Sequence, residues 1–295
     1  MKIMITGGLG HIGSALVESI KKDLDLTVVD DMHSQRYCSL FNRDRKFNFW
    51  ERDFSTISVD ELKKFDVIVH LAAITDAAKS MSEKEKVFDV NVTKTTSFIK
   101  AAKLAGISLF IFPSSTSVYG KGQDVMYEKD DNVLPQSPYA ESKAIIENKL
   151  RELSVPHVIL RFGTIFGCSK GMRFHTAINK FSFQSSVGQS ITVWKQNYEY
   201  FRPYLGINDA ILSINLAISN LLKINETYNV LTDNFRLSEI VKMIQNIKET
   251  KVRFVDTPLL NQNTYFVNDE KIRSMGFSPS DSLESEILKT MEMLG

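Results

Sequence analysis

A glycine-rich turn near the start of the chain constrains the fold more than any other feature. The apolar run Lys2–Thr6 predicts a buried strand, and the amphipathic stretch His11–Lys22 predicts a helix. Between them, Thr6–Gly13 satisfies both G-x-G-x-x-G and G-x-x-G-x-x-G. Glycines at this place permit a tight turn, close approach of the backbone to a pyrophosphate, and close packing of helix on strand. Because the helix start offers free N–H groups to phosphates, the turn predicts a dinucleotide site.

Short apolar runs alternate with helical patterns over the first 160 residues. The runs are rich in Ile, Val, Leu or Phe, as expected for strands buried on both faces. The alternation predicts βαβ units, and hence an α/β fold with a doubly wound parallel (Rossmann) sheet. The predicted strands are Lys2–Thr6, Leu26–Asp30, Asp66–His70, Ser108–Pro113 and His157–Arg161, with a weaker run at Lys46–Arg52. The predicted helices between them are His11–Lys22, Val87–Ala105 and Tyr139–Leu153.

The rhythm changes after about residue 163, where strand signals become sparse. We therefore expect a dinucleotide-binding domain over residues 1–163 and a small substrate lobe over residues 164–295. No linker separates them, and a segment at about 203–232 is expected to return to the first domain. The helices predicted in this half are Thr176–Phe183, Arg202–Leu222, Leu237–Ile247 and Leu283–Leu294.

Composition excludes several classes of protein. With 43% apolar residues in a chain of 295, a sizeable core can be buried. The formal net charge of +1 gives no general attraction to nucleic acid or to an anionic membrane. No run of 18 apolar residues predicts a membrane span, and Cys38 and Cys168 imply no disulfide framework. The five histidines lack ligand spacing, so we expect no metal, and we expect a soluble cytoplasmic protein.

Asp30 ends the second predicted strand, 22 residues after Gly8. A carboxylate at this place accepts hydrogen bonds from the adenosine ribose and repels a 2′-phosphate, which favours NAD over NADP. Arg36 lies nearby and is the residue type that could serve a 2′-phosphate. The acid is the stronger signal, so NAD is the predicted cofactor.

Tyr139 and Lys143 lie four residues apart on a predicted helix, so their side chains share one face. A lysine ammonium beside a phenol is expected to lower the tyrosine pKa, so that the tyrosine can exchange a proton with a sugar hydroxyl or ketone. Such pairs are also common on solvated helix faces. The hydroxyl cluster Ser114–Ser117 adds weight, because it follows the Ser108–Pro113 strand, and the carboxyl ends of parallel strands bind ligands.

Together these motifs resemble the extended short-chain dehydrogenase/reductases, in particular the NAD-dependent nucleotide-sugar epimerases and dehydratases of the UDP-glucose 4-epimerase type. Further matching stretches are His70–Ala73, Val90–Val92, Leu160–Gly167, Phe201–Tyr204 and Met275–Pro279. The resemblance implies Ser115, Tyr139 and Lys143 as catalytic residues. For the cofactor it implies Gly7, Gly10, His11, Ile12, Gly13, Asp30, Asp31, Asp53, Phe54, Leu71, Ala72, Ala73, Asn91, Ser114, Tyr139 and Lys143. For the substrate it implies Thr75, Ser115, Thr116, Tyr139, Thr164 and Arg202.

The resemblance further implies a nucleotide-diphosphate sugar as substrate and a homodimer. The dimer would form when helices near Val87–Ala105 and Tyr139–Leu153 pair into a four-helix bundle. The matches weaken in the substrate half of the chain. Thr164 stands where many members have an asparagine, and Pro203 where an aspartate usually follows the arginine. The sugar or its nucleotide is therefore expected to be unusual.

The choice of reaction depends on the residues after Ser115. Dehydratases of the family carry Asp-Glu, or at least Glu, directly after the catalytic Thr, whereas here Thr116 and Ser117 follow. This disfavours dehydration and favours an epimerase that works by transient hydride transfer. A nucleotide-sugar oxidoreductase, either a 4-keto reductase or a sugar dehydrogenase, is the alternative with the same site. Dinucleotide binding without turnover is the third reading, although members of that kind usually lose the tyrosine or the lysine.

Overall fold

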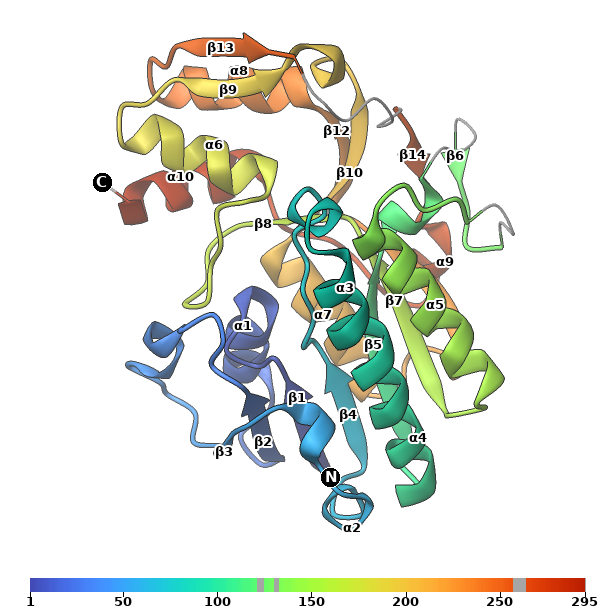
Figure 1. Cartoon of the computed structure of the whole chain (residues 1–295). Helices are drawn as coiled ribbons and strands as arrows, with labels where there is room; N and C mark the ends of the chain where they lie inside the picture. The colour runs from blue at the N-terminus through green and yellow to red at the C-terminus, as the bar shows by residue number, and fades with distance from the viewer. Residues whose placement is uncertain (121–124, 130–132, 257–263, 295) are drawn as a thin grey trace.

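The centre of the protein is a parallel sheet of seven strands, with helices on both faces (Figure 1). The protein is described by a computed structural model, which covers residues 1–120, 125–129, 133–256 and 264–294. The strand order is β11-β7-β5-β4-β1-β2-β3. This confirms the expected doubly wound α/β fold. The strands are β1 (Lys2–Thr6), β2 (Asp25–Asp30), β3 (Asn48–Glu51), β4 (Val67–His70), β5 (Leu109–Ser115), β7 (His157–Phe162) and β11 (Glu226–Val230).

The strand order reverses beside β1. This strand pairs with β2 on one side and with β4 on the other, and the chain crosses from β3 back to β4. The segments that follow β1 and β4 therefore separate and open a crevice at the carboxyl ends of the strands. Ligands bind at this place in open α/β sheets.

Two apolar cores lie on opposite faces of the sheet, because successive strand residues point to opposite sides. Ile3 and Ile5 pack with α1 (His11–Ser19) and α7 (Ile207–Ile218). Met4, which lies between them, packs with α4 (Thr95–Ala105) and α5 (Pro138–Glu152) on the other face. Burial on both sides explains why the strands read as continuous apolar runs.

The helices of this half differ from the predicted ones at their ends. α1 ends at Ser19 rather than at Lys22. The helix predicted over Val87–Ala105 is divided into α3 (Lys84–Phe88), a π-helical segment (Asp89–Lys94) and α4, which Gly106 ends with a φ of +75°. The short elements are α2 (Val59–Leu62) and the 3-10 turns Tyr37–Leu40, Phe54–Thr56, Lys79–Met81 and Thr116–Tyr119.

A third core holds the C-terminal lobe together. Its helices are α6 (Ala177–Ser186), α8 (Leu237–Ile247) and α10 (Leu283–Leu294), which gather at the upper left of Figure 1. Small sheets complete the lobe, in the orders β12-β10-β8 and β13-β9, and a further pair joins β14 to β6. The remaining elements are β6 (Val125–Met126), β8 (Thr164–Phe166), β9 (Ile191–Trp194), the turn Lys195–Asn197, β10 (Phe201–Gly206), β12 (Asp233–Arg236), β13 (Val252–Val255), β14 (Phe266–Val267) and α9 (Glu270–Arg273).

The helix predicted over Arg202–Leu222 is wrong at its start. Residues 202–206 belong to β10, which pairs in parallel with β8 and antiparallel with β12, and α7 begins only at Ile207. The partners of β10 lie far away in the sequence, so a local pattern could not reveal them. The same reason explains why the other short strands of this half were not predicted.

After β10 the chain returns to the main sheet. α7 packs against α1, and β11 pairs with β7 at the edge of the sheet. The expected boundary at residues 163 and 164 falls between β7 and β8. In the part of the chain that the structure describes, no helix is both long enough and apolar enough to cross a membrane.

Candidate active site

Two cavities adjoin at the carboxyl ends of the strands. One, of about 630 Å³, is lined by the turn Gly7–Gly13 and by residues that follow β2 and β4; we call it the glycine-turn cavity. The other, of about 390 Å³, lies between the end of β5, α5 and the C-terminal lobe; we call it the tyrosine cavity. Molecules bound in the two cavities would touch, because several residues line both. These are Ile12, Leu71, Thr75, Asp76, Arg173 and His175.

The glycines of the turn lie so close to neighbouring backbone that a side chain would not fit. Gly7 has a φ of +66°, and a Cβ there would lie 2.6 Å from the backbone nitrogen of Ala72. A Cβ on Gly13 would lie 2.6 Å from the Cα of Gly8. No side chain caps the start of α1, so the N–H groups of its first turn, from His11 on, are free for an anion. This is the cradle that a pyrophosphate requires.

Backbone hydrogen bonds fix the side chain of Asp30 at the end of β2. Its carboxylate accepts hydrogen bonds from the N–H groups of Leu9 (3.1 Å) and Met32 (3.0 Å), and both Asp30 and Asp31 line the glycine-turn cavity. Burial raises the pKa of Asp30, and these backbone bonds counter that effect.

Arg36, the residue that could have served a 2′-phosphate, lines the same cavity but is bound to the C-terminal half of the chain. Its guanidinium donates to the carbonyl oxygens of Gly171 and Met172, the latter at 3.0 Å. The arginine therefore joins the first domain to the C-terminal half of the chain.

The remaining cofactor candidates fall into two groups. Phe54, Leu71, Ala72 and Ala73 line the glycine-turn cavity. Asp53, Asn91 and Ser114 make internal bonds instead. Asp53 accepts from Lys94 Nζ at 2.7 Å, and Asn91 exchanges two hydrogen bonds with the backbone of Ile74. Ser114 donates to Glu147 Oε1 at 2.6 Å.

The predicted catalytic residues come together in the tyrosine cavity. Ser137 caps the start of α5 by accepting from the Ala140 N–H, and Pro138 occupies its first turn, so the helix begins directly before Tyr139. Tyr139 lies beside Ser115 at the end of β5, whose hydroxyl acts to lower the tyrosine pKa. Lys143, one turn further along α5, donates to the carbonyl oxygen of Pro113 at 2.8 Å. All three line the same cavity.

The electrostatics of this site differ from the prediction. Burial raises the pKa of Tyr139, and the groups that counter it are the Arg173 charge and the hydrogen bond to Ser115. Burial also lowers the pKa of Lys143 to about 7. The expectation that Lys143 lowers the tyrosine pKa is therefore wrong, because Arg173 is the cation that acts on Tyr139. No sequence motif marked Arg173.

Most of the predicted substrate-binding residues line the tyrosine cavity, but Thr116 does not. Thr75, Thr164 and Arg202 line the tyrosine cavity. The Arg202 guanidinium lies over the Tyr265 ring, and its buried Nη2 has no hydrogen-bond partner among the described residues. Thr116 is 3% exposed and donates to the carbonyl oxygen of Phe162, so Ser117 faces the cavity in its place.

Several residues of the cavity wall were not predicted. Arg173 donates to Thr75 Oγ1, and its buried Nε has no partner among the described residues. Trp194, the last residue of β9, lines the tyrosine cavity. These residues lie where the motifs are weakest, and only the packing of the two lobes brings them to the site. Others of this kind are His175, Lys180, Asn197, Tyr200 and Tyr204.

Residues 167–173, which we call the docking loop, lie against the glycine turn. His11 Nε2 donates to the carbonyl oxygen of Gly167 at 3.1 Å, and the Gly171 N–H donates to Ser14 Oγ at 2.9 Å. Burial lowers the pKa of His11 to about 3, so this histidine is neutral at pH 7. The loop that carries Arg173 is thereby fastened to the dinucleotide-binding domain.

The fold and the paired cavities define an enzyme of the dinucleotide-binding Rossmann class. The sequence profile described as the NAD dependent epimerase/dehydratase family matches residues 3–230. The chain belongs to this family, which confirms the resemblance and agrees with NAD as the expected cofactor.

Relatives within the family catalyse different reactions. The chain is 27% identical to the dTDP-D-glucose 4,6-dehydratase of Mus musculus, over 99% of this chain and 88% of that protein. It is 25% identical to the UDP-glucose 4-epimerase of Lactobacillus helveticus, over 84% and 82% of the two chains. The structure of a UDP-glucuronic acid 4-epimerase from Bacillus cereus superposes with a TM-score of 0.89 at 24% identity, covering 100% of both chains. This last likeness supports the fold.

Proposed function

We propose that the chain is an NAD-dependent epimerase of a nucleotide-diphosphate sugar that works by transient hydride transfer. The observation that carries the proposal is the arrangement of Ser115, Tyr139 and Lys143, which share one cavity directly beside the glycine-turn cavity. Dinucleotide-binding proteins without turnover do not need such an arrangement. The tyrosine and lysine therefore favour an enzyme over a sensor or scaffold.

The residues of the glycine-turn cavity fit NAD. The turn would hold the pyrophosphate, since Gly7 and Gly13 leave no room for side chains and the start of α1 is free for an anion. Asp30 would accept from the adenosine ribose hydroxyls. NAD, when bound, accepts a hydride from a sugar carbon and later returns it to the keto sugar.

The chain's own groups move and hold the proton. Tyr139, in its phenolate form, takes the proton of the sugar hydroxyl on its phenol oxygen as the carbonyl forms, and gives it back when the carbonyl is reduced. Ser115 holds the reacting oxygen through the hydroxyl that it also presents to Tyr139. Lys143 binds the ribose of the nicotinamide half, with its ammonium oriented by the carbonyl oxygen of Pro113.

A diphosphate substrate suits the far wall of the tyrosine cavity. Arg202 lines this wall, and its buried Nη2 has no hydrogen-bond partner within the described parts of the chain, so a phosphate oxygen would satisfy it. The relatives named above act on UDP- and dTDP-sugars, which supports this substrate class for the chain.

Dehydration is disfavoured although a dehydratase is among the relatives. Removing a hydroxyl from the sugar requires acids beside it, and Thr116 and Ser117 cannot serve. Among the described residues that line the tyrosine cavity, Asp76 is the one carboxylate.

The substitution Tyr139→Phe tests the proposal, because it removes one oxygen and keeps the ring. Purified protein is incubated with UDP-, GDP-, CDP- and dTDP-sugars, and the products are identified by NMR. We expect an epimerised sugar without net change in NADH, and a loss of about 10²- to 10⁴-fold in kcat for the variant. Stoichiometric NADH formation or consumption would instead establish the oxidoreductase alternative. Unchanged turnover in Tyr139→Phe would show that Tyr139 is not a catalytic residue.

We also propose that the protein is a homodimer that pairs α4 and α5 with the same helices of a second copy. Both helices cover one face of the sheet (Figure 1) and Leu104 on α4 is 73% exposed. Sedimentation velocity at micromolar concentration tests this, and a monomer at all concentrations would contradict it.

A further inference from the structure

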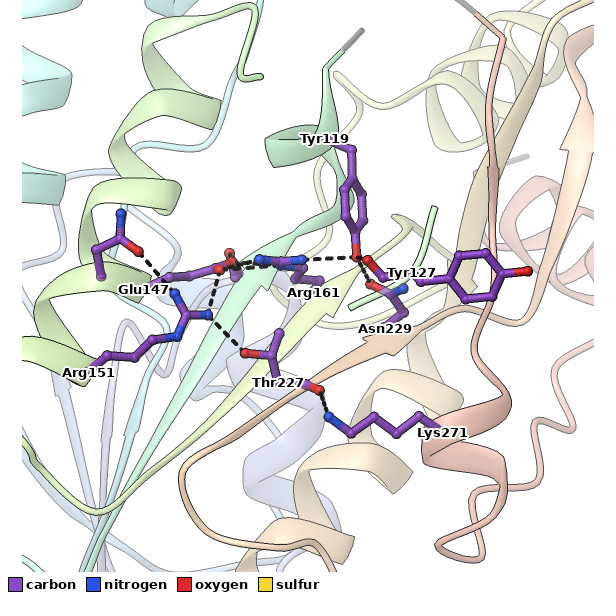
Figure 2. A network of polar contacts seen from close by, with 10 residues as sticks. Tyr119, Tyr127, Glu147, Arg151, Arg161, Thr227, Asn229 and Lys271 are labelled. Atoms are coloured by element: carbon purple, nitrogen blue, oxygen red, sulfur yellow. Dashed lines mark hydrogen bonds and ion pairs between the residues drawn. The ribbon is translucent and has the colours of Figure 1, made fainter. Parts of the chain in front are cut away.

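Glu147 is a buried carboxylate to which the proposed reaction assigns no task. It is 1% exposed and lies on α5 one turn after Lys143 and two turns after Tyr139. Residues at this spacing share one face of a helix, so the acid extends the row that begins with the reacting tyrosine. Figure 2 shows Glu147 between Arg151 and Arg161, with hydrogen bonds and ion pairs to both.

Three consecutive residues of β5 are each held by a different turn of α5. Tyr139 lies beside Ser115, and Lys143 donates to the carbonyl oxygen of Pro113 at 2.8 Å. Glu147 accepts from Ser114 Oγ at 2.6 Å. Glu147 therefore fixes the residue that lies directly between the other two contacts.

Besides the carbonyl oxygen of Pro113, the centroid of the Phe112 ring lies 4.5 Å from Lys143 Nζ and supports its positive charge. Burial is the main reason that its pKa falls to about 7; Glu147 raises this pKa, and Arg173 on the docking loop lowers it. His70, on β4, is neutral because burial lowers its pKa to about 3. Burial raises the pKa of Tyr139, on the same helix, and so opposes a negative charge there.

Arg161, on β7, compensates the charge of Glu147. Its Nη2 lies 2.7 Å from Glu147 Oε2, and its Nε donates to the same carboxylate. Its Nη1 donates to the Tyr119 hydroxyl at 3.0 Å, which in turn donates to Asn229 Oδ1 at 2.6 Å (Figure 2). A carboxylate persists in a protein interior only with such partners. The network thus allows a negative charge to be kept close to the reacting groups.

We propose that Glu147 is a positioning residue for the reaction: it fixes the end of β5 through Ser114 and supplies the negative charge that the buried Lys143 ammonium faces. The inference rests on the proposed function only in taking Ser115 and Lys143 as groups of the reacting site.

The substitution Glu147→Gln separates charge from shape, because the amide oxygen still accepts from Ser114. Protein labelled with ¹³C-lysine is titrated between pH 5 and 10 as purified, and the Lys143 signal is assigned by its absence in Lys143→Met. We expect the titration midpoint of Lys143 in Glu147→Gln to fall by about one pH unit or more. The matched control is Glu152→Gln, an exposed acid of the same helix paired with Lys149, which leaves the midpoint unchanged.

A second variant guards against misfolding from the unpaired Arg161. Glu147→Gln/Arg161→Met removes both buried charges, so a midpoint that falls in it as well assigns the effect to the loss of Glu147 and not to an unpaired Arg161. In both variants the high-pH limb of kcat moves to lower pH with the midpoint. An unchanged midpoint in both variants overturns the proposal. If the wild type turns over no nucleotide sugar, the proposed function fails. The titration still shows whether Glu147 raises the pKa of Lys143.

Discussion

Gly171 of the docking loop rests on the backbone of Gly10 in the glycine turn. A Cβ at position 171 would lie 2.4 Å from the carbonyl oxygens of Gly10 and of Leu9. Two distant segments therefore meet with backbone against backbone, and the turn expected to hold a pyrophosphate also carries part of the C-terminal half.

The substitution Gly171→Ala should displace the docking loop, because the added methyl group meets backbone that cannot move aside. We expect NAD to dissociate faster from the variant, since the loop no longer covers the turn, and the free energy of unfolding to fall by about 1–3 kcal/mol. Release of NAD is followed by fluorescence after rapid dilution, and stability by urea unfolding.

The control for this variant is Ser169→Ala in the same loop. It adds no atoms, and the Ser169 hydroxyl has no hydrogen-bond partner among the described residues. Equal NAD release from Gly171→Ala and the wild type would show that the docking loop does not retain the cofactor.

The preference for NAD should depend on Asp30 and not on Arg36. In Asp30→Asn we expect NAD affinity to fall by about 10- to 100-fold, as for the loss of a charge-assisted hydrogen bond, and NADP to be rejected less strongly. In Arg36→Met the preference should persist, because this guanidinium already binds the docking loop. Isothermal titration with both dinucleotides measures the two ratios. A variant Arg36→Met that loses NADP binding present in the wild type would contradict this view.

Stability should fall in acid because of His70. Burial lowers its pKa from 6.5 to about 3, so below pH 6.5 the unfolded chain binds a proton that the folded chain does not. The free energy of unfolding therefore decreases as the pH falls from 6.5, by about 2 kcal/mol at pH 5 for this one histidine. Urea unfolding at the two pH values measures the loss. We expect His70→Phe to remove that share of the pH dependence, and the exposed His33→Asn to leave it in place.

The buried ion pair should show strong coupling in stability. Replacing Arg161 alone by Met leaves Glu147 without its main partner, and we expect a loss of about 3–5 kcal/mol. Replacing both residues, by Met and Gln, should cost less than the sum of the two single changes. Urea unfolding of the four proteins gives the coupling energy, and additive losses would mean that the pair does not act as a unit.

Sequence patterns predicted the parts of the molecule that are built from contiguous segments. The turn Gly7–Gly13, the strands of the first half and the shared helix face of Tyr139 and Lys143 follow from local periodicity and spacing. The hydroxyl cluster Ser114–Ser117 could be placed at the carboxyl end of a strand, and the family resemblance singled out Ser115 within it. The family relationship rests on the same stretches.

Features that join distant segments could not be predicted in this way. Arg173 reaches the site from a loop without a motif, and Arg36 reads as a possible phosphate ligand until its contact with Met172 is seen. The strand β10 depends on partners more than 25 residues away, Arg236 pairing with Phe201 and Thr164 with Tyr204. The pKa of Tyr139 was misjudged for a related reason, because burial depends on the whole fold.

The two walls of the tyrosine cavity have separate origins in the chain. The wall that carries Ser115, Tyr139 and Lys143 is anchored by β5 and α5, and its geometry is set by contacts between those two elements. The opposite wall, with Trp194 and Arg202, comes from segments that make no part of that anchorage. Under the proposed function, exchanging the opposite wall would change the sugar nucleotide that binds and leave Ser115, Tyr139 and Lys143 in place.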